Sequence, residues 1–495
     1  MHYYSTRDRA LRYTAAEAVK LGLSREGGLL TPTQIPQMDR AFLENLLTAD
    51  YQERAAQVMA LYLTDYTLDE LRSFAKNAYG PDKFDTPAVA PVRTVDESTH
   101  CLELWHGPTS AFKDMALQML PQLLSASLGK TGEDKTVCIL VATSGDTGKA
   151  AMEGFADVPQ TKILVFYPKD GVSAVQEAQM VTQEGDNVGV CAVVGNFDDA
   201  QSGVKRIFSD PDIRQTLSER GYVLSSANSI NWGRILPQVV YYISAYCDLV
   251  RDGKLTMGDK VNFCVPTGNF GDILAAYYAG RMGLPVGKLI CASNRNDVLT
   301  DFLRTGVYDR NRPFHTTMSP SMDILISSNL ERLLFDLSGE NDEEVRGYME
   351  ALASQGRYQV SDKIRAGLDA AFWGGFCGEE DTAATIGRYY RDYGYLIDTH
   401  TAVAANVMEQ YRAATGDTTP TVFVSTASPY KFCDSVLKAI GEVSAGDGVE
   451  LLDQLHAVTG TAVPRRLAAL RGKQRRFDLS CEKQAMDGVV LDFLK

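Results

Sequence analysis

The stretch that decides the fold is HGPTSAFKD at residues 106–114, and it runs directly into the apolar segment MALQMLPQLL at 115–124. Lys113 stands at the start of an apolar helix among small or apolar neighbours, so its ammonium group is poorly hydrated there. Poor hydration favours the neutral amine, which is the form that Schiff-base chemistry with an aldehyde requires. A lysine that packs its stem at a helix start and extends its charge into water remains an alternative.

Two glycine-rich turns follow apolar, β-branched runs. The run at 136–142 ends in TSGDTG at 143–148, and the run at 261–265 passes through Pro266 into TGNFGD at 267–272. Each pattern predicts a strand, a loop and a helix. Glycines allow a backbone to approach an anion closely, and the following helix offers free N–H donors. Neither turn matches a dinucleotide fingerprint or a P-loop, so the sequence disfavours a nucleotide ligand.

Composition restricts the class of protein. The chain of 495 residues is long enough for more than one core, and its formal net charge of −14 argues against a nucleic-acid partner. Nine cysteines are scattered singly without metal-like grouping, which is typical of reduced thiols in a cytoplasmic protein that holds no metal. The start of the chain lacks an apolar signal region, and no apolar run is long enough to cross a membrane.

The order of apolar runs predicts the architecture. The first ~95 residues show helical periodicity at 42–47 and 55–63 and end in a proline-containing connector, which predicts a small helical subdomain. After it, short apolar runs alternate with amphipathic stretches. The runs lie at 162–167, 188–194, 223–226, 289–292 and 422–425. Such alternation predicts parallel sheets covered by helices.

The lysine segment and the two turns, in this order, resemble the threonine synthase family in its longer form. Further blocks agree and extend over almost the whole chain. They are NSINWGRILPQ (228–238), ASNRNDVLTDFLRTG (292–306), SPSMDILISSNLERLL (319–334), DTHTAVAANV (398–407) and STASPYKF (425–432).

This resemblance implies an α/β fold of two open parallel-sheet lobes, the fold type II of tryptophan-synthase-β-like proteins, with a small N-terminal helical subdomain. It suggests a subdomain at 1–95 and a catalytic region at 96–495. Within that region, we expect a smaller lobe at about 125–235 and a larger lobe at about 96–124 plus 236–495.

The resemblance also implies pyridoxal 5'-phosphate as the cofactor, joined to Lys113 as a Schiff base. The Thr426 hydroxyl would meet the ring nitrogen of the cofactor. The sequence departs from the family in this block, with Ser428 where a histidine is common and Tyr430 in place of a small residue. The cofactor phosphate would lie against the backbone of Gly268, Asn269, Phe270, Gly271 and Asp272.

The reaction that the resemblance implies is conversion of O-phospho-L-homoserine and water into L-threonine and phosphate, by β,γ-elimination and replacement. Lys113 would serve as both linker and base. Hydroxyls and loop N–H groups suit a substrate carboxylate, and an arginine suits a leaving phosphate. The candidate substrate-binding residues are Ser110, Thr143, Ser144, Asp146, Thr147, Asn231 and Arg234.

Several alternatives remain open at this stage. Asp146 could instead cap the helix that starts near Gly148, and Arg295 is a second candidate for the substrate phosphate. The same lysine and turns would serve another pyridoxal-phosphate lyase that releases a 2-oxo acid, whereas a non-enzymatic binding module should have lost the lysine or a turn. The sequence does not determine the oligomeric state.

Overall fold

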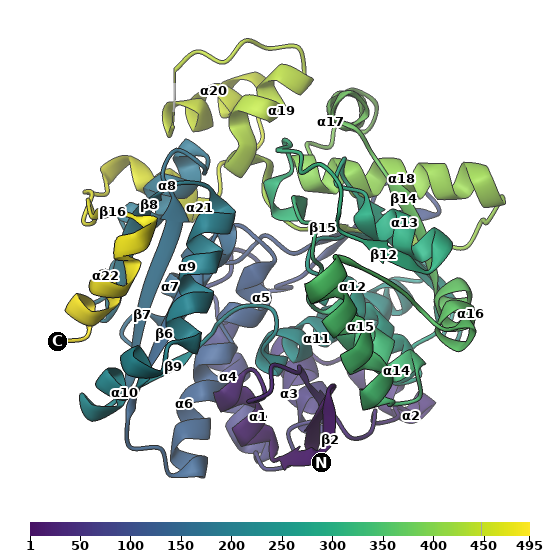
Figure 1. The fold of residues 1–495 in the computed structure, drawn as a ribbon. Coiled ribbons are helices and arrows are strands. Elements are labelled where there is room, and N and C mark those ends of the chain that lie inside the picture. Colours follow the sequence, from purple (N-terminus) through teal and green to yellow (C-terminus); the bar gives the residue numbers. More distant parts are fainter. Residues whose placement is uncertain (447) are drawn as a thin grey trace.

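The computed structural model describes residues 1–446 and 448–495. Five parallel strands form the smaller of its two main sheets, in the order β16-β8-β7-β6-β9 (Figure 1). The strands are β6 (Thr136–Ala142), β7 (Thr161–Pro168), β8 (Val188–Val194), β9 (Tyr222–Ser225) and β16 (Ser480–Glu482). The helices that accompany them are α7 (Asp146–Phe155), α8 (Ala174–Val181), α9 (Phe197–Ser209), α10 (Pro211–Glu219) and α22 (Met486–Phe493).

The larger sheet has the order β14-β11-β10-β15-β5-β4, and only the pairing of β4 with β5 is antiparallel. Its strands are β4 (Val92–Thr94), β5 (Thr99–Glu103), β10 (Val261–Pro266), β11 (Val286–Ser293), β14 (Phe372–Phe376) and β15 (Thr421–Ser425). Its main helices are α11 (Trp232–Arg251), α12 (Gly271–Arg281), α13 (Val298–Thr305), α16 (Asp362–Ala371), α17 (Glu379–Tyr393) and α18 (Thr399–Thr415).

These sheets confirm the predicted fold class of two parallel-sheet lobes. The runs at 136–142 and 188–194 form β6 and β8 with the bounds that the sequence indicates. Both strands are buried over almost their whole length, which explains why their sequences are continuously apolar rather than alternating.

The N-terminal region is mainly helical, as predicted, but it also contains a small antiparallel sheet of order β2-β1-β3. Strands β1 and β3 have only three residues each, and β2 is exposed or half-buried along its whole length. The sequence therefore shows no apolar pattern that predicts these strands. The elements are β1 (Tyr3–Ser5), β2 (Asp8–Tyr13), β3 (Leu30–Pro32), α1 (Ala15–Leu21), α2 (Arg40–Leu46), α3 (Tyr51–Ala60) and α4 (Leu68–Ala78).

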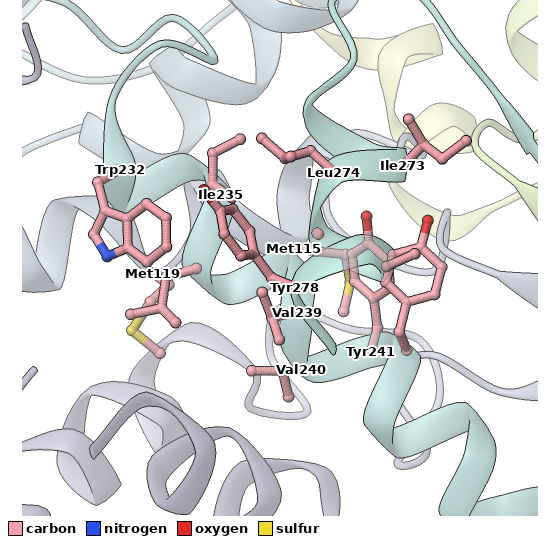
Figure 2. Close-up of a cluster of buried hydrophobic side chains, with 14 of the residues drawn as sticks. Met115, Met119, Trp232, Ile235, Val239, Val240, Tyr241, Ile273, Leu274 and Tyr278 are labelled. Atoms are coloured by element: carbon pink, nitrogen blue, oxygen red, sulfur yellow. The ribbon is translucent and has the colours of Figure 1, made fainter. Parts of the chain in front are cut away.

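Helix α11 packs against both α5 (Lys113–Leu117) and α12 within the hydrophobic core. Figure 2 shows Met115, Trp232, Ile235, Tyr241 and Leu274 converging there. The five side chains are at most 1% exposed. This packing fixes α5, and with it the backbone of Lys113, between the two sheets. Helix α6 (Leu120–Thr131) continues from α5.

The C-terminal part of the chain leads from the larger sheet back to the smaller one. After β15 it forms η2 (Pro429–Phe432), and its last strand, β16, pairs with β8 at the edge of the smaller sheet (Figure 1). The division into a smaller lobe at about 125–235 and a larger lobe at about 96–124 plus 236–495 stays a prediction. Its limits did not include the return of β16 to the smaller sheet. None of the helices in the described ranges is long and apolar enough to cross a membrane. The remaining elements are β12 (Val307–Asp309), β13 (Arg357–Gln359), α14 (Leu330–Leu337), α15 (Asp342–Gln355), α19 (Cys433–Ala439), α20 (Glu450–Thr459), α21 (Arg465–Ala468), η1 (Pro320–Met322), η3 (Ala469–Gly472) and η4 (Lys483–Ala485).

Candidate active site

Loops that follow strands of both sheets meet around Lys113. The N–H of Phe112 donates to the carbonyl of Thr426, which directly follows β15, at 2.8 Å. The Lys113 Nζ lies 3.7 Å from Asp146 Oδ2, beyond the end of β6, and donates to Ser321 Oγ at 3.3 Å. Ligands of parallel-sheet proteins are bound at such strand ends. The structure therefore brings together the lysine segment and two of the predicted loops.

The lysine segment folds around the carboxylate of Asp114. That carboxylate accepts hydrogen bonds from the Thr109 backbone N–H at 2.8 Å and from the Thr109 hydroxyl at 2.7 Å. Burial raises the pKa of Asp114 to about 6. A Cβ on Gly107 would lie 2.6 Å from the Asp114 side chain, and Ser110 has a φ of +59°. This tight turn explains the small residues ahead of Lys113 and directs its side chain into the space between the sheets.

Lys113 is desolvated, as the sequence predicts, with 9% of its surface exposed. Burial lowers its pKa from the ordinary lysine value; the nearby Asp146 carboxylate opposes the shift, and the positive charges of Lys431 and Arg234 add to it. Because the ordinary pKa of a lysine leaves almost no neutral amine at neutral pH, this shift favours nucleophilic reactivity.

The turn after β6 presents Asp146 toward Lys113. The hydroxyl of Thr143 accepts the N–H groups of Gly145 and Gly148, at 3.0 and 2.9 Å, so it holds the turn closed. Helix α7 begins at Asp146 itself, its N-cap residue is Gly145, and the Asp146 carboxylate contacts Gln176 and Lys431 instead of the helix backbone. The capping alternative for Asp146 is therefore wrong. Ser144 and Thr147, both half-buried, complete this turn.

The turn after β10 forms a tight backbone cradle at the start of α12. The carbonyl of Gly268 accepts from the Ser327 hydroxyl at 2.7 Å, and the carbonyl of Asn269 accepts from the Asn329 N–H at 3.1 Å. Phe270 adopts the left-handed conformation, with φ of +64°, immediately before Gly271 begins the helix. The first N–H groups of a helix have no partner within it and attract anions.

Asp272 at this helix start has an unusual environment. Its Oδ1 accepts from the hydroxyl of Tyr242 at 2.6 Å and from that of Tyr241, whereas Oδ2 is buried and has no hydrogen-bond partner among the described residues. Burial raises the pKa of Asp272 to about 6, against the lowering effect of the two tyrosine hydroxyls. The sequence assigned Asp272 only a backbone role and gave no sign of this side-chain environment.

Arg234 and Asn231 differ in what they offer a ligand. Arg234 is buried and donates to the Ala227 carbonyl at 2.5 Å, but its Nε has no partner in the described ranges. Burial lowers the pKa of Arg234 to about 10, so the guanidinium stays charged at neutral pH. The Asn231 amide is already engaged: it donates to the Val19 carbonyl and accepts the Gly233 N–H, both at 2.9 Å. Asn231 therefore caps α11 rather than presenting a free amide to phosphate. Arg295 is exposed.

The sequence did not predict three polar side chains that lie at the site. Lys431 contacts Asp146 Oδ1 at 2.7 Å, and Gln176 donates to the same oxygen at 2.8 Å. Ser321 contacts Lys113, and its N–H donates to His400 Nε2 at 3.2 Å. The presence of Lys431 in the STASPYKF block could have indicated a role at the site. Its pairing with Asp146 could not be predicted, because the two residues are far apart in the sequence.

The residues present fit a phosphorylated aldehyde. Lys113 offers a desolvated amine, and the start of α12 offers backbone N–H groups to a phosphate. Besides Asp272 Oδ2 and Arg234 Nε, the buried Ser110 hydroxyl also lacks a hydrogen-bond partner among the described residues. Buried polar atoms without partners are costly, so these groups are candidates for contact with a polar ligand. Among the described residues, no cluster of His, Cys, Asp and Glu could hold a metal ion.

Comparison with known families identifies the same regions. Family models match residues 2–79 as "Threonine synthase N terminus", 93–371 as "Pyridoxal-phosphate dependent enzyme" and 401–489 as "Threonine synthase, C-terminal". The chain is 40% identical to a threonine synthase of Pseudomonas aeruginosa over 90% of this chain and 92% of that protein. It is 41% identical to human threonine synthase-like 1 over 86% of this chain, but it spans only 58% of that protein's length.

The solved structures agree. A threonine synthase from Brucella melitensis with bound pyridoxal phosphate matches with a TM-score of 0.88 and 36% identity, over 100% of both chains. Threonine synthase from yeast matches equally well, at 34% identity, over 100% of this chain and 98% of that one. The overall arrangement of sheets and loops is therefore shared with these enzymes.

Proposed function

The chain belongs to the threonine synthase family of pyridoxal-phosphate-dependent enzymes, and from this membership we propose that it converts O-phospho-L-homoserine and water into L-threonine and phosphate. The observation that carries the proposal is the buried amine of Lys113, 3.7 Å from Asp146, beside the backbone cradle at the start of α12. Its position between the two sheets suits a cofactor that is bound next to its substrate.

The cradle and the lysine have separate tasks. The N–H groups from Gly268 to Asp272 hold the cofactor phosphate, Lys113 binds the cofactor aldehyde, and Thr426 lies beside the lysine segment where its hydroxyl can meet the ring. Pyridoxal phosphate, when bound, supplies an electron sink for carbanion chemistry next to the substrate amine. The chain's own residues must then orient the substrate and move its protons.

Lys113 is the group placed to move protons at the substrate Cα and Cβ. Its buried amine would hold the cofactor aldehyde and would therefore lie close to the bound substrate, and desolvation favours its neutral, basic form. Ser144 and Thr147, with the backbone of the turn that Thr143 closes, are proposed to hold the substrate carboxylate. Asp146 stays close to the lysine as its counter-charge.

Arg234 is the proposed partner of the substrate phosphate. Its buried guanidinium remains charged and has an Nε without a partner among the described residues, and charge-assisted hydrogen bonds to phosphate stabilise its departure. Ser110, whose hydroxyl is likewise unpartnered there, is a second proposed contact. Asn231 supports Arg234 from the helix start rather than binding substrate itself.

The product of the reaction decides the proposal. Purified protein incubated with O-phospho-L-homoserine should release phosphate and L-threonine in equal amounts. Accumulation of 2-oxobutyrate with phosphate would replace the proposal with the phospho-lyase alternative, and absence of phosphate release would contradict both. The human relative carries the name threonine synthase-like 1, so assay of the product itself is needed. We also propose a cytoplasmic location, because all nine cysteines are unpaired and eight of them are buried.

A further inference from the structure

Lys431 is a buried lysine for which the proposed reaction has no role. It lies in η2, within the same STASPYKF block as Thr426, and its side chain is 0% exposed. Its Nζ contacts Asp146 Oδ1 at 2.7 Å and donates to the Thr109 carbonyl at 3.0 Å. Burying an ammonium group is costly unless it is paired and hydrogen-bonded, and both partners belong to the walls of the Lys113 site.

The Asp146 carboxylate is shared unequally between two lysines. Its Oδ1 receives Lys431 at 2.7 Å and the Gln176 amide at 2.8 Å, whereas its Oδ2 lies 3.7 Å from Lys113. Lys431 is therefore the principal counter-ion of Asp146. When Lys113 becomes bonded to a cofactor aldehyde, the carboxylate keeps a full partner and does not become an unpaired buried charge.

The same geometry joins three parts of the fold. Asp146 starts α7 of the smaller sheet, Thr109 belongs to the lysine segment, and Lys431 follows β15 of the larger sheet. The Ser173 hydroxyl, at the start of α8, also donates to the Lys431 carbonyl at 3.3 Å. A single side chain thus fixes the turn after β6 against the segment that carries Lys113.

We propose that Lys431 is a positioning residue for Lys113. Its ammonium group is the main partner of the Asp146 carboxylate and holds that carboxylate in place, so that Asp146 pairs only weakly with Lys113. The proposal rests on the proposed function in one respect, since it takes Lys113 as the lysine that binds the cofactor. Lys431 touches neither the cofactor aldehyde nor the substrate in this scheme; it acts through Asp146.

The charges around Lys113 determine the direction in which the loss of the Lys431 charge should shift the pKa of Lys113. Asp146 on α7 favours the ammonium form of Lys113, while Lys431 on η2 and Arg234 on α11 oppose it, and Asp272 on α12 is a further acidic neighbour. Burial alone would raise the pKa of Asp146, but Lys431 and Lys113 hold it well below its usual range. Removing the charge of Lys431 takes away a repulsion and releases Asp146 to Lys113, so both effects raise the pKa of Lys113.

The test is a titration of the Lys113 amine in the full chain freed of cofactor. Cyanate adds to a neutral amine and carbamylates it, so the rate of labelling of the Lys113 peptide against pH gives the midpoint of its titration. We expect Lys431→Met to raise this midpoint by about one pH unit, which slows labelling about tenfold below the midpoint. Lys431→Arg keeps the charge and should restore the midpoint to within a few tenths of a unit.

A surface lysine provides the matched control. Lys438 contacts Asp434 at 2.7 Å within α19, and its side chain is 65% exposed. Lys438→Met makes the same replacement and removes the same charge, but it should leave the Lys113 midpoint unchanged. An equal shift in both variants would show a general effect of charge and overturn the role of Lys431.

A second pair of variants covers the case in which Lys431→Met does not fold. Asp146→Asn, with Lys431 retained, should lower the Lys113 midpoint, because it removes the attracting carboxylate of the pair and leaves the repelling ammonium group of Lys431. Adding Lys431→Met to Asp146→Asn leaves a neutral pair, which is tolerated better than a single buried charge, and should bring the midpoint back up. If the double variant has the same midpoint as Asp146→Asn, Lys431 does not act on Lys113 and the proposal is wrong.

Failure of the proposed function gives a different result. Borohydride reduction of the cofactor-loaded protein and peptide mapping would then place the label on another residue, while the amine titration of Lys113 would still respond to Lys431. A correct label on Lys113 with no response to Lys431 would overturn only the positioning role.

Discussion

Replacing Gly268 by alanine tests the backbone cradle at the start of α12. A Cβ at this position would lie 2.6 Å from the carbonyl oxygen of Ser321, whereas ordinary contact begins near 3.4 Å. The obstacle is backbone, so the cradle or the Ser321 segment must move by about 0.8 Å. Ser321 also contacts Lys113, so the displacement reaches both ends of the proposed cofactor site.

The size of the effect follows from the cost of overpacking. A forced shift of this kind costs about 1–3 kcal/mol, which corresponds to a loss of about 5-fold to 150-fold in cofactor affinity if the bound state needs the undistorted cradle. The effect arises from collision with the Ser321 carbonyl, which is the atom nearest to a Cβ at position 268.

Gly271→Ala is the matched control in the same loop. Its Cβ would lie 3.2 Å from the terminal methyl group of Ile235, a flexible side-chain end that can move away. We expect its dissociation constant for pyridoxal phosphate, measured by equilibrium dialysis, to stay within about threefold of the unmodified protein. Circular dichroism would verify that both variants are folded. Unchanged affinity in Gly268→Ala, or an equal loss in Gly271→Ala, would refute the assignment of this cradle.

Three further changes test individual residues. Lys113→Ala should abolish threonine formation while leaving circular dichroism and thermal unfolding close to those of the unmodified protein; retained turnover would contradict its role. Arg234→Lys should raise the KM for O-phospho-L-homoserine by about tenfold to a hundredfold, because one charge-assisted contact is worth about 1.5–3 kcal/mol, and should leave cofactor affinity almost unchanged; equal losses would refute it. Burial raises the pKa of Asp272 from 3.8 to about 6, so the stability that its proton confers is present below about pH 4 and is lost as the pH rises through 6. Asp272→Asn cannot titrate and should remove up to about 3 kcal/mol of this fall in the urea unfolding free energy. A pH dependence equal to that of the unmodified protein would contradict the raised pKa.

The sequence predicted those elements whose pattern is local and continuous. Strands β6 and β8 are buried runs of apolar, largely β-branched residues, and the turn that follows β6 contains glycines at the required spacing. The desolvation of Lys113 could also be predicted from the sequence, because its apolar neighbours are adjacent in the chain. These features depend on residues that are close in sequence.

Features that depend on distant residues were not predictable. Lys431 and Asp146 are paired only because η2 and α7 come together in the fold. Asn231 is a predicted substrate-binding residue, but in the fold its amide donates to the carbonyl of Val19, which lies far from it in sequence. Strand β16 has three residues, too few to show a period, and it is a strand because β8 offers it an edge.

The most direct measurement is identification of the residue that carries the cofactor. Reduction of the cofactor-loaded protein with borohydride, followed by digestion and peptide mass mapping, should place a single pyridoxyl group on Lys113. A label on any other side chain, or no label at all, would contradict the proposed active site.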